Sequence, residues 1–287
     1  MPNETKLAFI GSGIMAEAMI KVILDKALIP PNQIVGSGPR QERSRELRDR
    51  YGIATTTDNR EAARAADIVV LSVKPQVLPA VLIELQGCIQ PKVLVLSIVA
   101  GRTMATIAAG LKHAAIVRAM PNTPAQIGEG MTVWTATPEV NQQQRPQAQA
   151  ILRAMGQEVY VAEERALDMA TAVSGTGPTY VFLMMEAMID AAVHLGFSRR
   201  VAMALVIQTV LGSALFARQS KKHLAELRNM VTSPGGTSAD AIYQLEKGSL
   251  RTILSKAIWA AYQKSLLLGE QSNSISSPER ELPLDES

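Results

Sequence analysis

The chain has 287 residues, of which 47% are hydrophobic and 19% are charged, a length that favours two domains and a composition that excludes a mainly disordered chain. The net charge of +3 and the aromatic content of 4% predict that it does not bind nucleic acid. The single cysteine, Cys88, excludes an intramolecular disulfide and a cysteine-based zinc cluster.

Short apolar runs alternate with helical patterns through the first half of the chain. The expected strands are residues 6–10, 33–35, 67–73, 93–98, 116–118, 131–134 and 159–161, and helices at 15–28 and 40–51 follow the first two. Strands separated by crossover helices indicate a mainly parallel sheet that is covered on both faces. We therefore predict an α/β fold whose N-terminal Rossmann-type domain spans residues 1–162.

A glycine-rich turn joins the first expected strand to the first expected helix. It consists of Gly11, Ser12, Gly13, Ile14, Met15 and Ala16. This is a dinucleotide-binding pattern, in which Gly11 permits the tight turn, Gly13 lets a pyrophosphate approach the backbone, and Ala16 lets helix and strand pack closely. The helix N-terminus would add amide donors for the phosphates. The alternative is a glycine turn that binds no nucleotide.

The end of the second expected strand bears on which dinucleotide is bound. NAD enzymes usually place an acidic residue there for the ribose hydroxyls, and this segment has none. Ser37, Arg40 and Arg43 are instead placed to hydrogen-bond a 2′-phosphate, and arginine is suited to such contacts. These arginines could also simply solvate a surface helix, which explains Arg40 only in part. We predict NADPH in preference to NADH, and NADH stays possible.

Three further expected strands end in loops with proline, glycine or charged residues, at residues 72–76, 97–101 and 118–124. Pro75 interrupts strand pairing and leaves Lys74 at the carboxyl edge of the sheet, where ligands bind in open α/β sheets. Each loop alone could be ordinary turn chemistry. Together they predict one ligand crevice.

From about residue 163 the pattern contains helices only. They are expected at residues 179–195, 200–217, 223–231, 238–247 and 250–269. So much apolar helix predicts that a second subunit covers part of it. Residues 201–217 reach the lower length for a membrane span, but we interpret them as buried in a core or a subunit interface. We predict an all-α C-terminal dimerisation domain at 163–271 and a disordered tail at 272–287.

Two glycine-rich turns interrupt this helical half, at residues 173–178 and 232–238. The second offers backbone amides and hydroxyls at a helix start, which can cradle a carboxylate or simply cap the helix. The three histidines lack metal-ligand spacing, so we expect no metal. A reductase without an evident strong acid suits a substrate that arrives already protonated, such as an iminium ion.

Taken together, these motifs resemble the pyrroline-5-carboxylate reductase family. The resemblance runs from residue 6 to about 269 and rests on segments 11–18, 72–76, 118–124, 172–182 and 231–246, which appear in the family's order. It implies NADPH-dependent reduction of 1-pyrroline-5-carboxylate to L-proline by hydride transfer to the imine carbon. It also implies a homodimer or higher homo-oligomer.

The resemblance also assigns roles to individual residues. Those implied to contact the cofactor are Gly11, Ser12, Gly13, Ile14, Met15, Ala16, Ser37, Arg40, Asn59, Val73, Lys74, Pro75 and Ala100. Those implied to hold the substrate carboxylate are Ser233, Gly235, Gly236 and Thr237. The implied catalytic hydroxyl belongs to Ser238, where the family has threonine.

Leu224, Asn229 and Thr179 also depart from the family's pattern, so two alternatives stay open. One is a reductase of another cyclic imino acid. The other is a non-catalytic NADPH-binding regulatory protein. A β-hydroxyacid dehydrogenase is disfavoured because residues 179–195 contain no lysine. No secretory signal is visible at the N-terminus, and we expect a cytoplasmic protein that binds neither membrane nor nucleic acid.

Overall fold

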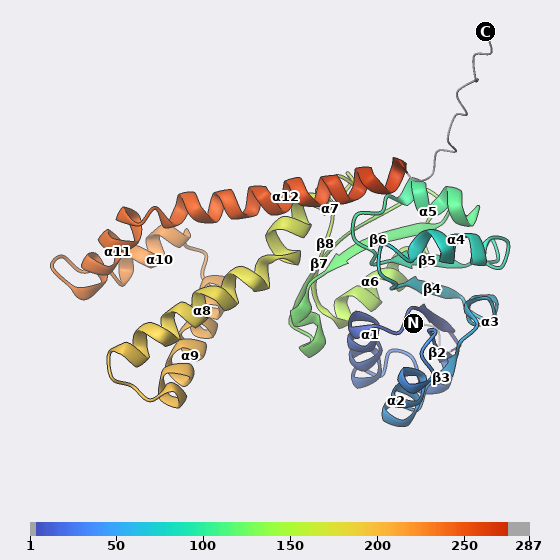
Figure 1. Ribbon diagram of the computed structural model, residues 1–287, viewed down its shortest axis with the longest axis horizontal. Coiled ribbons are helices and arrows are strands. Elements are labelled where there is room, and N and C mark those ends of the chain that lie inside the picture. The colour runs from blue at the N-terminus through green and yellow to red at the C-terminus, as the bar shows by residue number, and fades with distance from the viewer. Residues whose placement is uncertain (1–3, 275–287) are drawn as a thin grey trace, which may run out of the picture. The chain divides into compact units, whose positions relative to one another are not determined.

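The structure is a computed structural model that describes residues 4–274 (Figure 1). Its contacts divide it into two compact units. The first, called here the α/β unit, comprises the chain up to Thr176 together with the segment from Ala261 onward. The second, called the helical unit, spans Gly177–Ala260. These units are defined by contacts, and the domain boundaries at 162 and 271 stay predictions.

Within residues 4–274, the α/β unit has a single sheet of eight strands in the order β3-β2-β1-β4-β5-β6-β7-β8. The strands are β1 (Leu7–Ile10), β2 (Ile34–Ser37), β3 (Ala54–Thr56), β4 (Ile68–Leu71), β5 (Leu94–Ser97), β6 (Ile116–Pro121), β7 (Gly130–Ala136) and β8 (Gly156–Tyr160). Neighbours run parallel except for β6 and β7, which pair antiparallel in this part of the chain. The predicted Rossmann-type, mainly parallel sheet is confirmed.

Helices cover both faces of this sheet and create two hydrophobic cores. The helices of the α/β unit are α1 (Ile14–Asp25), α2 (Gln41–Tyr51), α3 (Asn59–Arg64), α4 (Leu78–Leu85), α5 (Met104–Leu111), α6 (Gln144–Ala154) and α7 (Ala166–Ala170). Because side chains alternate along a strand, β1 places Leu7 and Phe9 in one core and Ala8 and Ile10 in the other. Residues of α1, α2 and α6 complete the first core, and residues of α3, α4 and α5 complete the second. Each buried Leu, Ile or Val stabilises the unit by about 1.5–3 kcal/mol.

The glycine-rich segment at 173–178 differs from the turn that the sequence predicts. The backbone is π-helical over Thr171–Gly175, directly after α7, and α8 (Gly177–His194) begins two residues later. Thr176 N donates to the carbonyl of Thr171 at 2.8 Å, and the Thr171 hydroxyl donates to the Leu167 carbonyl at 2.7 Å. Residues 173–175 are therefore helical, and the expectation of a glycine-rich turn over them is wrong.

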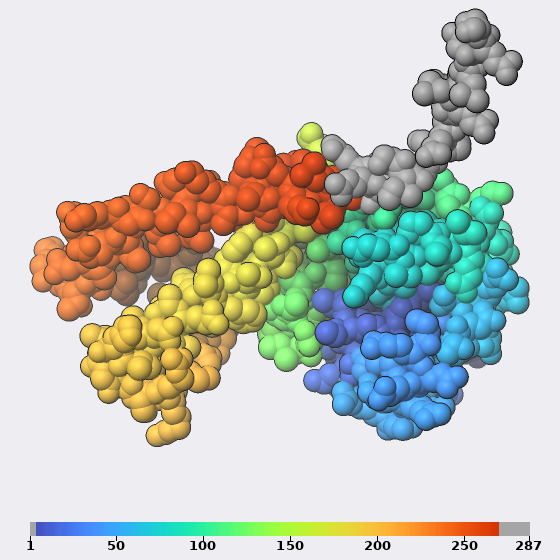
Figure 2. Space-filling model, in the orientation of Figure 1, coloured from blue at the N-terminus to red at the C-terminus, as the bar shows by residue number. Residues whose placement is uncertain are grey.

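The helical unit consists of α8, α9 (Arg199–Gln219), α10 (Leu224–Met230), α11 (Thr237–Lys247) and the first part of α12 (Leu250–Ser274). Within it, only Ala202 and Val206 have buried side chains among the apolar residues that the structure describes. The face of α8 turned to the viewer is open to solvent (Figure 2, yellow). Many of the exposed residues are large and apolar, including Phe182, Leu183 and Leu205.

By length and composition alone, α9 could cross a membrane, and only 11% of its most apolar stretch is buried within the chain. Burial of this helix in the core of its own chain, one of the two expectations from the sequence, is therefore wrong. Cover by a second subunit stays consistent with the structure. The last helix, α12, includes residues 272–274, so these three residues are helical. The rest of the predicted tail, residues 275–287, lies outside the described part of the chain.

Candidate active site

The turn after β1 is fixed by neighbouring strands of the sheet. Gly11 has φ of +101°, and a Cβ atom there would lie 2.8 Å from both the backbone N and Cγ1 of Val73. A side chain at this position is therefore excluded by both conformation and space. Gly11 N donates to the Ser37 carbonyl at 2.9 Å, and the Ser72 hydroxyl donates to the Gly11 carbonyl at 2.8 Å. The structure thus brings Gly11, Ser37 and Val73 together at the carboxyl edge of β1, β2 and β4.

Gly13 is the residue that would face a ligand. It is the N-cap of α1, and it has no side chain with which to cap the first amides of that helix. A Cβ atom built on Gly13 would meet nothing within 4 Å, so the space in front of the helix is open. Open space next to uncapped helical amides fits the pyrophosphate of a dinucleotide. The turn lies between β1 and β4, where the strand order reverses and ligands bind in such sheets.

Ser37 and Asn59 also lie together, but in an unexpected arrangement. Ser37 is fully buried, and its hydroxyl donates to Asn59 Oδ1 at 2.7 Å. The Asn59 amide nitrogen in turn donates to Glu84 Oε2 at 2.8 Å. Since the Ser37 proton is directed to Asn59, this geometry does not direct it to a 2′-phosphate. Glu84, on α4, was not anticipated from the sequence because it lies inside a helix and outside every motif.

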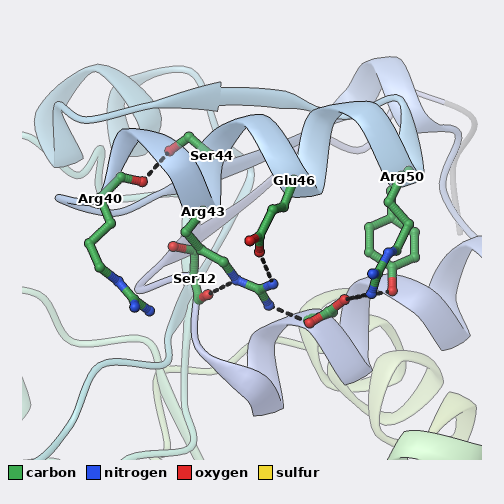
Figure 3. A network of polar contacts seen from close by, with 8 residues as sticks. Ser12, Arg40, Arg43, Ser44, Glu46 and Arg50 are labelled. Carbon is green, nitrogen blue, oxygen red and sulfur yellow. Dashed lines mark hydrogen bonds and ion pairs between the residues drawn. The ribbon is translucent and has the colours of Figure 1, made fainter.

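The two arginines considered for the 2′-phosphate differ in their surroundings (Figure 3). Arg43 Nε donates to the Ser12 carbonyl at 3.1 Å, and its two terminal nitrogens pair with Glu17 and Glu46. Arg40 is exposed, and among residues 4–274 no hydrogen bond or ion pair involves its guanidinium. Arg43 is therefore engaged within the protein, whereas Arg40 is available to a ligand.

Glu17 is the centre of the polar network that links α1 to α2. Besides Arg43, it accepts hydrogen bonds from Arg50 at 2.8 Å and from the Tyr51 hydroxyl at 2.9 Å. Partial burial alone would raise the pKa of Glu17, but the hydrogen bonds from Arg43 and Tyr51 outweigh it, and the pKa lies below its ordinary value. For Arg43, burial alone would lower the pKa, and the bond to Glu17 outweighs it and raises the pKa.

The loops after β4 and β5 are held together by a buried arginine that the sequence analysis missed. Arg102 Nη2 donates to the Pro75 carbonyl at 2.9 Å, and burial lowers the pKa of Arg102. Lys74 is exposed next to this bond, and Ala100 lies in the β5 loop two residues before Arg102. The loop residues predicted for the cofactor thus come from one edge of the sheet. Arg102 carried no signal because it belongs to no recognised motif.

In the third polar segment at a strand end, residues 118–124, two side chains bond to other parts of the protein. Arg118 is buried, and its Nη1 pairs with Glu164 Oε1 at 2.9 Å. Glu164 also accepts from the Met104 amide at 2.7 Å. Asn122 donates to the Ser174 carbonyl at 3.1 Å and accepts from the Met131 amide at 2.9 Å. Both side chains thus connect neighbouring segments, and the single crevice expected from the three strand ends stays a prediction.

The second predicted site is the turn between α10 and α11 in the helical unit. Gly235 has φ of +70°, and Gly236 N donates to the Ser233 carbonyl at 3.0 Å. Gly236 is the N-cap of α11, and no side chain caps that helix. Ser233, Gly235 and Thr237 are exposed, and Ser238 is half-buried. In the part of the chain that the structure describes, no hydrogen bond involves the hydroxyl of Ser233 or Ser238.

A Rossmann-type sheet that carries this glycine turn, followed by a helical domain, is an architecture of NAD(P)-dependent oxidoreductases. Residues 164–268 match a family profile described as pyrroline-5-carboxylate reductase dimerisation. Residues 6–101 match a profile described as NADP oxidoreductase coenzyme F420-dependent.

A pyrroline-5-carboxylate reductase of Synechocystis is 41% identical over 93% of this chain and 99% of the relative. The solved structure of a pyrroline-5-carboxylate reductase from Coxiella burnetii matches with a TM-score of 0.86 and 38% identity, over 93% of this chain and 99% of that one. A Plasmodium falciparum pyrroline carboxylate reductase with NADP bound matches with a TM-score of 0.85 and 32% identity, over the same shares. The chain belongs to the pyrroline-5-carboxylate reductase family.

This membership confirms the family, the fold class and the enzyme class predicted from the sequence. The dimerisation profile also supports a homo-oligomer. Among the described residues, no group of three or more His, Cys, Asp or Glu side chains could hold a metal ion. The roles of individual residues stay predictions.

Proposed function

We propose that this protein reduces 1-pyrroline-5-carboxylate to L-proline with NADPH, as a cytoplasmic homodimer or higher homo-oligomer. The proposal is supported by the names of its relatives, which match nearly its whole length. The single observation that carries it is the exposed turn at 233–238. This turn combines two glycines, uncapped helix amides and two unengaged hydroxyls, a donor set suited to a small carboxylate.

The cofactor is proposed to bind along the carboxyl edge of the α/β unit. The residues assigned to this role are Gly11, Ser12, Gly13, Ile14, Met15, Ala16, Ser37, Arg40, Asn59, Val73, Lys74, Pro75 and Ala100. Within this set, the amides at Gly13 and the start of α1 would take the pyrophosphate, and Arg40 the 2′-phosphate. Ser37 and Asn59 would act as a pair that shapes the ribose end, because their side chains are bonded to each other at 2.7 Å.

The substrate carboxylate is proposed to bind at Ser233, Gly235, Gly236 and Thr237. In this assignment the Ser233 hydroxyl and the amides of Gly235 and Thr237 donate hydrogen bonds to it, while the Gly236 amide donates to the Ser233 carbonyl and Gly236 lets the carboxylate approach the backbone. These donors belong to one short turn whose shape is held by the bond from Gly236 N to the Ser233 carbonyl. An anion at this position also interacts favourably with the positive end of the α11 dipole.

When bound, NADPH supplies a hydride to the imine carbon. The C=N double bond becomes single, and the ring nitrogen, which carries its proton in the iminium form, becomes an amine. The turn at 233–238 would hold the ring by its carboxylate, so that catalysis depends mainly on orientation. The Ser238 hydroxyl would accept a hydrogen bond from the ring N–H and keep the imine carbon in line for the hydride.

The direct test is to follow NADPH oxidation spectroscopically with 1-pyrroline-5-carboxylate, with NADH and a six-membered cyclic imine as comparisons. Fast turnover with NADPH and the five-membered imine is the expected result. Preference for the six-membered imine would instead show a reductase of another cyclic imino acid. NADPH binding without turnover on any imine would show a non-catalytic binding protein.

The role of Ser238 is tested by Ser238→Ala, with Ser238→Thr as the matched control. We expect the alanine variant to lose about tenfold in turnover, the order of one hydrogen bond to a charged group, and to melt at an unchanged temperature. The threonine variant keeps the hydroxyl and should keep the activity. Unchanged turnover in Ser238→Ala would show that the hydroxyl does not contact the substrate.

A further inference from the structure

The Ser12–Gly13 peptide in the dinucleotide turn is held by a side chain from a different helix. Arg43, on α2, directs its Nε–H to the Ser12 carbonyl at 3.1 Å. In a trans peptide the carbonyl and the following N–H point in opposite directions. Because the Ser12 carbonyl faces α2, the Gly13 N–H faces away from α2. The Arg43 bond therefore fixes the direction of the Gly13 amide.

The position of Arg43 is itself determined by carboxylates on two helices. One terminal nitrogen pairs with Glu17 on α1, and the other with Glu46 on α2 at 2.9 Å. The side chain is only 16% exposed, so its guanidinium is held between the helices. All three nitrogens of Arg43 thus contact protein acceptors (Figure 3). Arg40, three residues earlier, has no such partner among residues 4–274.

We propose that Arg43 is a positioning residue of the nucleotide site, which orients the Ser12–Gly13 peptide toward the pyrophosphate, whereas Arg40 keeps the contact with the 2′-phosphate that is proposed above. Glu17 serves as the counter-ion that keeps Arg43 in place. This inference rests on the proposed function in taking the ligand to be a nicotinamide dinucleotide. It gives a role to Arg43, which is not among the cofactor contacts that the resemblance implies.

The two roles predict different effects on the affinities for NADPH and NADH. Arg43 acts on the turn that is proposed to meet the pyrophosphate, and both dinucleotides have a pyrophosphate. Arg43→Met should therefore weaken the binding of NADPH and of NADH by the same factor, about tenfold for a charge-assisted hydrogen bond. Arg40→Met should weaken the binding of NADPH by about tenfold or more and leave the affinity for NADH unchanged, because NADH has no 2′-phosphate. Arg48→Met is the matched control, because it removes an exposed charge from the same helix, and it should change neither affinity by more than about twofold.

The experiment measures dissociation constants for NADPH and NADH by fluorescence titration of the full-length protein, together with the melting temperature of each variant. Arg43→Lys adds a readout that a merely structural role would not move. Lysine restores the charge opposite Glu17, but one nitrogen cannot occupy the positions of three. We expect the lysine variant to recover the melting temperature and to stay weaker than the wild type for both dinucleotides.

Selective loss of NADPH affinity in Arg43→Met would overturn the proposal and make Arg43 a phosphate ligand. Unchanged affinities in that variant, or full recovery of binding in Arg43→Lys, would overturn it as well. Failure of the proposed function is distinguishable, because the titrations need no imine. A wild-type protein that binds NADPH but reduces no imine would disprove the function and leave the affinity pattern to decide the role of Arg43. A protein that binds neither dinucleotide would disprove both.

Discussion

The two units of this chain differ in how they bury apolar surface. The α/β unit has two complete hydrophobic cores, one on each face of its sheet. In the helical unit, most large apolar side chains are exposed, and Ala202 and Val206 are the buried apolar residues among those that the structure describes. Buried apolar side chains offset the loss of chain entropy on folding, and in the helical unit few of them are buried within the chain itself. We therefore expect the helical unit to depend on a second copy for its stability.

The strongest test of this difference places charges on α9. Ile207 and Leu211 are one turn apart on the same face of α9, and each is about half exposed in the single chain. If a second copy covers them, the double variant Ile207→Glu/Leu211→Glu should lose about 1.5–3 kcal/mol for each side chain and dissociate. We expect a monomer in sedimentation analysis, with the thermal transition of the helical unit lost and that of the α/β unit retained.

The control for this variant is Ile83→Glu on α4. Ile83 is 76% exposed in the α/β unit, so the same chemical change is made on a unit that has its own core. It should leave the oligomer and both transitions intact. An α9 variant that still sediments like the wild type would show that α9 is not covered by a second copy.

Replacing a glycine should destabilise the well-packed α/β unit more than the exposed turn of the helical unit. Gly11 and Gly235 both have positive φ, but a Cβ atom on Gly11 would contact Val73 at 2.8 Å, and one on Gly235 would meet nothing within 4 Å. Gly235→Ala should therefore cost only backbone strain, about 1–2 kcal/mol. Gly11→Ala adds a steric conflict with backbone and should cost several kcal/mol, of the order of 3 or more. Thermal melting of the two variants measures this difference, and equal losses would contradict it.

Much of the α/β fold could be predicted from the sequence because buried strands appear there as short apolar runs. Seven of the eight observed strands were expected within a few residues. The exception is β3, whose sequence Ala54-Thr55-Thr56 is short and mostly polar, and which pairs only at the sheet edge. The π-helical segment at 171–175 was also missed, since glycine and serine usually indicate a turn, and here local hydrogen bonds decide otherwise.

The candidate site was predicted less completely, for a physical reason. Motifs reveal residues whose backbone conformation is unusual, such as Gly11 and Gly235. They do not reveal partners that are distant in sequence, and Glu84 and Arg102 became visible only through their bonds to Asn59 and Pro75. For the same reason the sequence singled out Arg40 as a cofactor contact and gave no positioning role to Arg43, whose bond to the Ser12 carbonyl only the structure shows.

Gly13→Ala separates binding from folding within the α/β unit. Gly13 has φ of −77° and ψ of −175°, which alanine adopts without strain. The unfolded chain loses some freedom, so the variant should be as stable as the wild type or more stable by up to about 1 kcal/mol. Its methyl group would project into the open space proposed for the pyrophosphate. We expect NADPH affinity to fall by at least about tenfold in titrations, and unchanged affinity would place the pyrophosphate elsewhere.

The smallest expected effect is an acid sensitivity confined to the α/β unit. Glu17 and Glu158 belong to this unit, and burial alone would raise the pKa of each. Hydrogen bonds, chiefly from Arg43 to Glu17 and from Trp134 to Glu158, outweigh burial and hold both pKa values below the ordinary value of 4.5. A carboxyl group whose pKa is lower in the folded state stabilises the fold above its unfolded pKa. That contribution is lost as the pH falls through about 4.5 toward the folded pKa.

Glu17→Gln should remove this group's share of the acid sensitivity. The variant is expected to be less stable than the wild type near neutral pH, by about 1 kcal/mol, because Arg43 loses a charged partner. Its α/β transition should then fall less steeply than that of the wild type below about pH 4.5, so the two curves converge in acid. Glu42→Gln, an exposed carboxyl on α2, serves as the control and should follow the wild type. Parallel curves for Glu17→Gln and wild type would show that the bonds to Glu17 are not formed in solution. That result would also contradict the position proposed for Arg43, because Glu17 is the carboxylate on α1 that holds Arg43 beside the Ser12 carbonyl.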